Sequence, residues 1–145
     1  MTVSVFDVTM YVLKMHGKMT HMKLQKLVYY CQAWSLVWDE QVLFKEKIEA
    51  WANGPVVPQL FAHLRTLYLV GLKDLDRGDS SVLSDRQKET IQAVLNYYGD
   101  KSPQWLSDLT HLEDPWKETR NGLPPGERSK REITHEKLAW YYGSL

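Results

Sequence analysis

Apolar residues recur at intervals of three and four positions along much of this chain, which is the spacing of one buried face of an α-helix. The clearest stripe consists of Leu24, Leu27, Val28, Cys31 and Trp34. Thr20 precedes this stripe as a favourable helix N-cap, and the polar segment 39–41 follows it. We therefore predict a helix that begins after Thr20 and ends near Trp38.

The remaining residues of this helix fall beside the stripe. Lys23, Gln25 and Lys26 lie largely off the apolar face. Tyr29 and Tyr30 flank it, so we expect at least one of these two side chains to be half exposed.

Similar spacing, combined with start and stop signals, predicts five further helices. The first runs from Ser4 to Met15, and the next begins at Pro58, with an apolar stripe that extends to Tyr68 before Gly71. Another is capped by Ser84 and ends at Gly99. A short helix begins at Ser102 and Pro103, and the last is capped by Thr134. The segments 73–81 and 112–129 are expected to be irregular. The pattern predicts a mainly α fold, a compact single-domain bundle (1–145) of about six short helices.

A small β-hairpin is expected after the second helix, because segments 42–44 and 47–52 are rich in β-prone residues. The stretch AWANGPVVPQL follows. Pro55 pushes Gly54 out of the right-handed helical region, and Gly54 can adopt backbone angles that other residues avoid. We predict a rigid corner held by Asn53, Gly54 and Pro55, with Trp51 and Val56 packed inward. A role of this corner in binding a partner also stays open.

Composition narrows the functional classes. The chain has 145 residues and a formal net charge of zero, which argues against nucleic acid as the main partner because phosphate binding calls for a basic excess. No apolar run approaches the ~18 residues of a membrane span. The single cysteine excludes an internal disulfide and fits a reducing, cytoplasmic location. Six Trp and eight Tyr are typical of a chain that forms an interface.

The residues that most often bind metals or act as nucleophiles give little support for such sites. No two of the five histidines are four residues apart, and there is no CxxC or HExxH motif. We expect neither a metal nor a cofactor. Cys31 lies on the apolar stripe, so we interpret it as a core residue rather than a nucleophile.

The densest cluster of polar residues is DLTHLEDPWKETR, from Asp108 to Arg120. His111 beside Glu113 or Asp114 could form an acid–base pair. The alternative, which we favour, is that His111 hydrogen-bonds a helix end while Trp116 anchors the irregular segment, because no nucleophile or oxyanion donor is identifiable.

Three segments carry a family resemblance: KLQKLVYYCQAW (23–34), LFKEKIEAWANGPVVPQLF (43–61) and DLTHLEDPWKETR (108–120). In order and spacing they resemble the Panacea domain, or SocA-like antitoxin family, also described as phage-associated GepA-like. The resemblance runs from about Thr20 to the final helix, but segment 39–42 lacks the Gly and Pro often found before the LF pair. It implies a non-enzymatic antitoxin that neutralises a toxin, usually by direct contact. In one branch of the family the antitoxin delivers the toxin to a ClpXP-type protease.

On this basis we expect the cognate toxin protein as partner, and direct binding as the mechanism. There are two alternatives. The chain could be a proteolytic adaptor, or it could be a phage-associated enzyme or regulator that uses the His111 region. Aromatic enrichment at interfaces predicts six contact residues: Tyr29, Tyr30, Trp116, Trp140, Tyr141 and Tyr142. Exposed aromatic side chains are also compatible with a homo-oligomer.

Overall fold

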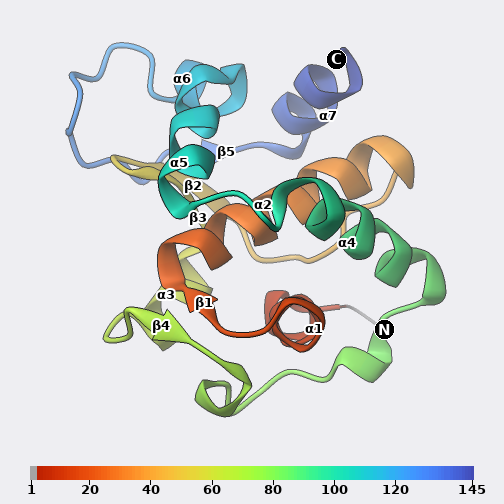
Figure 1. Ribbon diagram of the computed structural model, residues 1–145. Coiled ribbons are helices and arrows are strands. Elements are labelled where there is room, and N and C mark those ends of the chain that lie inside the picture. Colours follow the sequence, from red (N-terminus) through yellow and green to blue (C-terminus); the bar gives the residue numbers. More distant parts are fainter. Residues whose placement is uncertain (1–2) are drawn as a thin grey trace.

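Seven α-helices build most of the computed structural model, which describes residues 3–145 (Figure 1). They are α1 (Val5–His16), α2 (His21–Trp38), α3 (Pro58–Leu64), α4 (Asp85–Tyr98), α5 (Pro103–Leu112), α6 (Asp114–Thr119) and α7 (His135–Gly143). Two short 3₁₀ helices, η1 (Leu72–Asp74) and η2 (Ser80–Val82), lie in the polar segment before α4. The prediction of a mainly helical fold is confirmed.

Five short strands form two small antiparallel sheets. In the first sheet β1 (Met19–Thr20) pairs with β4 (Leu69–Val70). In the second, β2 (Ile48–Trp51) lies between β3 (Gly54–Val56) and β5 (Glu132–Ile133). The β5 strand arrives from the far end of the chain, so the second sheet joins the middle of the sequence to its last helix.

The predicted helix starts are confirmed at the level of individual hydrogen bonds. The hydroxyl groups of Ser4, Thr20, Ser84, Ser102 and Thr134 each accept a hydrogen bond from a backbone N–H in the first turn of the helix that follows. Such caps satisfy donors that have no partner within the helix. Pro58 occupies the first turn of α3, where its missing N–H costs nothing.

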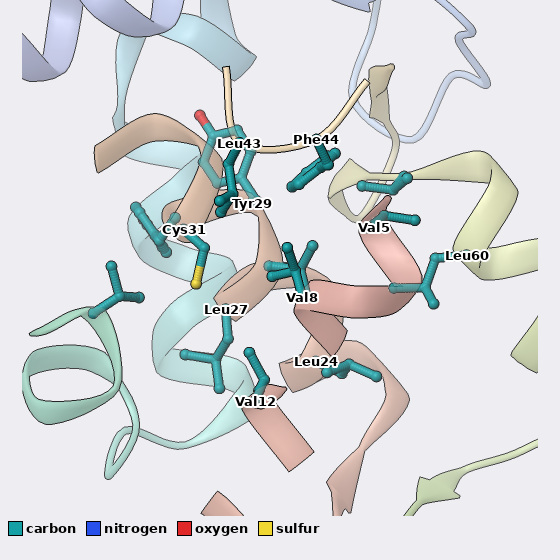
Figure 2. Packing of buried hydrophobic residues seen from close by; sticks show 14 of the residues in the cluster. Val5, Val8, Val12, Leu24, Leu27, Tyr29, Cys31, Leu43, Phe44 and Leu60 are labelled. Carbon is teal, nitrogen blue, oxygen red and sulfur yellow. The ribbon is translucent and has the colours of Figure 1, made fainter. Parts of the chain in front are cut away.

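Helix α2 runs through the centre of the fold, and α1, α4, α5 and α7 all pack against it. Its apolar stripe meets Val5, Val8 and Val12 of α1 in the cluster of buried side chains shown in Figure 2. Cys31 is fully buried in the same cluster, and burial raises the pKa of its thiol. The interpretation of Cys31 as a core residue is therefore confirmed.

The predicted hairpin is wrong in its pairing. Strand β2 pairs with β3 across the turn at Ala52 and Asn53, and segment 42–44 forms no strand. A side chain of α2 explains this: Gln32 accepts a hydrogen bond from Leu43 N at 2.7 Å and donates one to Phe44 O at 2.7 Å. Because Gln32 satisfies the backbone as a neighbouring strand would, Leu43 and Phe44 can be buried without a sheet.

Two further boundaries differ from the prediction. Helix α3 ends at Leu64 rather than near Tyr68, because Val70 is drawn into the β1–β4 pair and is fully buried there. Tyr68 is left 78% exposed. The segment 112–129, which was expected to be irregular, contains α6, with Pro115 in its first turn. The strand β5 follows that segment and was not predicted.

Candidate functional site

The predicted rigid corner is a tight turn between β2 and β3. Trp51 pairs with Gly54 and Ala50 pairs with Pro55 across the two strands. Gly54 has a φ of +125°, a conformation that disfavours every side chain. Val56 is buried as predicted, and Trp51 is half-buried with its ring edge-on to Phe61, the centroids 4.9 Å apart.

Trp116 connects α6 to this turn. Its indole Nε1 donates a hydrogen bond to Trp51 O at 2.8 Å. The imidazole of His111 stacks on the Trp116 ring with 4.1 Å between centroids, and the Arg120 guanidinium lies 5.2 Å from the same ring. The prediction that Trp116 anchors its segment is confirmed.

Arg120 is buried, with 6% of its surface exposed, and it binds backbone carbonyls instead of a carboxylate. Its Nη1 donates to Ala50 O at 3.0 Å, and its Nη2 donates to Glu127 O at 2.7 Å and to Pro124 O at 3.5 Å. A guanidinium can serve several acceptors at once because its donors are fixed in a planar fork. Arg120 therefore holds the loop that follows α6 against strand β2.

Replacing Arg120 by methionine is expected to release this loop. The substitution leaves Ala50 O without its side-chain donor, and buried bonds from a charged donor are each worth about 1.5–3 kcal/mol. We expect the free energy of unfolding to fall by about 2–3 kcal/mol, and cleavage by endoproteinase Glu-C after Glu127 to become about tenfold faster. Urea unfolding and timed digestion followed by mass spectrometry measure the two effects.

Arg65→Met is the matched control, because Arg65 is exposed at the end of α3. Its unfolding free energy and its cleavage at Glu127 are expected to stay within error of the unsubstituted chain. Equal digestion of the Arg120 and Arg65 variants would show that the loop is held by other contacts.

Three of the predicted contact residues are core residues. Tyr29, Tyr30 and Tyr142 are 1%, 0% and 1% exposed, so the expectation that Tyr29 or Tyr30 is half exposed is wrong. The rings pack edge to face with one another, and Tyr30 stacks on Tyr98 at 4.1 Å. Their place in the core excludes them from a docking surface of the folded chain, because a partner cannot reach them.

The hydroxyl groups of this tyrosine cluster converge on Glu113. Tyr30 and Tyr142 each donate a hydrogen bond to Glu113 Oε1 at 2.7 Å. Because the Tyr142 proton is used in that bond, Tyr29 donates to the Tyr142 oxygen, 3.0 Å away. Burial raises the pKa of Glu113, and the two tyrosine donors lower it in part.

The acid–base pair that the sequence suggested is not assembled in this geometry. Glu113 accepts hydrogen bonds from the two tyrosines, and the Oδ1 atom of Asp114 lies 4.0 Å from the Nζ atom of Lys117. The Nε2 atom of His111 is buried and has no hydrogen-bond partner within residues 3–145, so the predicted bond from His111 to a helix end is also not formed by that atom. Burial lowers the pKa of His111, with a further contribution from the charge of Lys26.

The other three predicted contact residues line or approach the surface. Trp140 is 80% exposed, whereas Tyr141 and Trp116 are half-buried. Trp140 and Tyr141 line a groove of about 440 Å³ between α6 and α7, which we name the α6–α7 groove. Its other lining residues are Asp114, Pro115, Glu118, Glu136, Lys137, Ser144 and Leu145.

The sequence pattern gave no indication that polar residues of α2 are buried. Gln25 and Lys26 were expected off the buried stripe, yet each is only 2% exposed. The reason is that α2 is surrounded by other elements, so its polar flank is covered as well as its apolar face. Gln25 accepts a hydrogen bond from Val57 N at 2.9 Å, which ties α2 to the segment after β3. No periodicity in the sequence signals this burial.

Across residues 3–145, no group of three or more His, Cys, Asp or Glu side chains is placed to hold a metal ion. Within the same range, none of the helices has the length and apolar character that crossing a bilayer requires.

Comparison with known proteins gives one match. Residues 24–117, about two thirds of the chain, match the family described as antitoxin SocA-like, Panacea domain. The matched range contains most of α2, the β2–β3 turn, Glu113 and Trp116. No curated protein and no solved structure matches the chain.

Proposed function

We propose that this chain, which belongs to the SocA-like antitoxin family with a Panacea domain, neutralises a cognate toxin by binding it directly. The family supports an antitoxin role, and the large exposed tryptophan beside a groove supports a binding mechanism. The chain acts in this proposal without catalysis, by covering a surface that the toxin needs. The fold supplies a rigid body for such contact, since its helices pack on one central helix.

Trp140 carries the proposal about the binding surface. An indole ring that is 80% exposed contributes little to the stability of the isolated chain. Tryptophan is among the residues most often found at the energetic centre of interfaces, because it combines a large apolar area with a hydrogen-bond donor. Tyr141 and Leu145 extend the apolar surface around it.

Charge specifies the kind of partner surface that fits this groove. Three carboxylates, those of Asp114, Glu118 and Glu136, line it together with one lysine, Lys137. Lys137 lies 3.7 Å from Glu118, which partly neutralises that carboxylate. A toxin segment with an apolar side chain flanked by Lys or Arg would therefore complement the α6–α7 groove.

The proposal predicts that Trp140→Ala weakens toxin binding at least about tenfold, because removing an interface tryptophan commonly costs 2 kcal/mol or more. The toxin candidate is the product of the adjacent reading frame, which is to be co-expressed with the chain. Isothermal titration calorimetry then measures the affinity between the two proteins. Protection of cells from growth arrest is expected to fall in parallel. The unfolding free energy of the variant should stay within about 0.5 kcal/mol.

Tyr68→Ala is the matched control. Tyr68 is 78% exposed, and it lies beside β4, at the opposite end of the molecule from α7 in the view of Figure 1. If Trp140→Ala leaves toxin binding unchanged and Tyr68→Ala abolishes it, the interface lies at the β1–β4 end of the molecule instead. Disappearance of the toxin during rescue, reversed in a host without a ClpXP-type protease, would assign the adaptor mechanism instead.

A further inference from the structure

We propose that a second pocket binds a carboxylate group carried on an aromatic body. The pocket has a volume of about 610 Å³ and lies between the N-terminal half of α2, the β2–β3 turn, α3 and the loop after α6. The residues that carry the argument are Met22, Lys26, Trp51, Phe61, Arg128 and Lys130. We name it the Lys26 pocket, and it is separate from the α6–α7 groove.

Lys26 lines this pocket although its side chain is almost fully buried, with 2% of the residue exposed. Within residues 3–145 its ammonium has neither a hydrogen bond nor an ion pair, and burial lowers its pKa to about 8. The group is therefore still largely protonated at neutral pH. A buried, unpaired cation is costly, and an anion in the pocket would remove that cost.

The turn at Gly54 makes room for this ammonium. A Cβ atom on Gly54 would lie 2.6 Å from Lys26 Cε and 3.1 Å from Lys26 Nζ. The lysine end group thus passes beneath the turn at a point where any larger residue would obstruct it. Glycine at this position serves both the backbone angle and the close approach of Lys26.

The surroundings of Lys26 favour an anion. Three cationic residues line the pocket, the buried Lys26 of α2 together with Arg128 and Lys130 of the loop after α6, and no carboxylate lines it. This holds although the chain as a whole is neutral. In Figure 1 the loop that contains Arg128 and Lys130 passes close to the β2–β3 turn, so the basic residues come from distant parts of the sequence.

His21, which also lines the pocket, adds no further positive charge to it. Val57 N donates to Gln25 Oε1, which directs the amide nitrogen of Gln25 to His21 Nε2 at 3.0 Å. His21 Nε2 must then act as an acceptor, which requires the neutral ring. Burial and the charge of Lys26 lower the pKa of His21 to about 4, in agreement with this assignment.

The apolar walls of the Lys26 pocket indicate what kind of group carries the carboxylate. Trp51 and Phe61 form an edge-to-face pair at the wall, and Met22 is 42% exposed beside them. A pocket of this volume with aromatic walls and a small number of charged groups is typical of small-ligand sites. Of the three cationic residues, Lys26 is buried, whereas Arg128 and Lys130 are exposed to solvent. A single negative charge balances the buried ammonium of Lys26, so a carboxylate on a flat apolar body fits better than a multiply charged phosphate.

A matched pair of probes tests the proposal on the intact chain. N-acetyl-tryptophan carries the carboxylate, and N-acetyl-tryptophanamide has the same aromatic body without the charge. By ligand-observed NMR and calorimetry, we expect the acid to bind at least about tenfold more tightly than the amide. In Lys26→Met this preference should vanish while binding of the amide is unchanged, since methionine keeps the apolar volume.

The outcomes either support or overturn the site. Equal binding of acid and amide, no binding of either up to their solubility, or an undiminished preference in Lys26→Met would each overturn it. The comparison of the two probes on the unsubstituted chain does not depend on the variant folding. A ten-residue peptide with a C-terminal tryptophan distinguishes the source: binding as tight as the small acid indicates a protein terminus, and binding of the small acid alone indicates a free metabolite.

Discussion

Replacing Glu113 by alanine is expected to lower the free energy of unfolding by about 3 kcal/mol, measured by urea denaturation. The substitution removes the acceptor that Tyr30 and Tyr142 share, and a buried O–H donor left without an acceptor costs about 1–3 kcal/mol. It also leaves a space between two buried rings, which adds a cavity cost. The loss should appear in full because Tyr30 and Tyr142 have no access to water.

Glu113→Gln separates the hydrogen bonds from the charge. The amide oxygen can accept from both tyrosines, so we expect a loss of about 1 kcal/mol or less. Because burial raises the pKa of Glu113 in the fold, the native glutamate contributes most below the ordinary glutamate pKa. Its contribution falls as the pH rises through the raised value. Stability relative to the Gln variant should therefore decrease over that interval.

A loss below about 1 kcal/mol for Glu113→Ala would show that the tyrosine hydroxyls find other partners. A pH dependence of the opposite sign, with the native chain gaining on the Gln variant as the pH rises, would show that the two hydrogen bonds outweigh burial in setting the charge of Glu113. Both measurements use the chain alone and do not depend on any partner.

Gly54→Ala is expected to destabilise the chain by about 2–4 kcal/mol. Part of the cost is the backbone angle, since a φ of +125° is strained for any residue with a Cβ. The rest comes from the approach of the new methyl group to Lys26 Cε, at 2.6 Å before relaxation. The lysine end group must move, so the Lys26 pocket should also change shape. Urea unfolding of the variant gives the total cost.

Two further variants divide that cost. Gly122→Ala is the control for backbone angle, because Gly122 has a φ of +86° and nothing lies within 4 Å of its Cβ position; we expect about 1 kcal/mol. Adding Lys26→Ala to Gly54→Ala removes the steric contact, and the double-mutant cycle should show favourable coupling of at least about 1 kcal/mol. Strict additivity would mean that Lys26 relocates without strain.

Local signals in the sequence predicted much of the helical framework. Hydroxyl caps and proline at the first turn mark helix starts through bonds within a few residues, so Thr20, Ser84 and Pro58 could be identified without knowledge of the fold. The end of α3 could not be identified in this way, because it depends on the pairing of Val70 with Met19, which is far away in sequence. Contacts of that kind have no local pattern.

The candidate sites were predictable to a smaller degree. The glycine and proline of the turn indicated an unusual backbone, and the structure has one there. Aromatic content alone did not show that Trp140 is exposed and Tyr142 is buried. Both residues lie on the short helix α7, and the burial of each depends on which face of the helix packs against the rest of the fold. The burial of Lys26 and Arg120 is decided by elements from other parts of the chain, and charged residues are ordinarily expected at the surface.

The two glutamines of α2 have a consequence for the β2–β3 turn between them. Gln32 holds the backbone at Leu43 and Phe44 before the hairpin, and Gln25 holds Val57 after it. Seven residues apart, the two side chains lie on the same side of the helix, two turns from each other. Both ends of the hairpin are thus attached to one rigid rod. A molecule that contacts the hairpin meets a segment with little conformational entropy left to lose, so more of the contact energy is available as affinity.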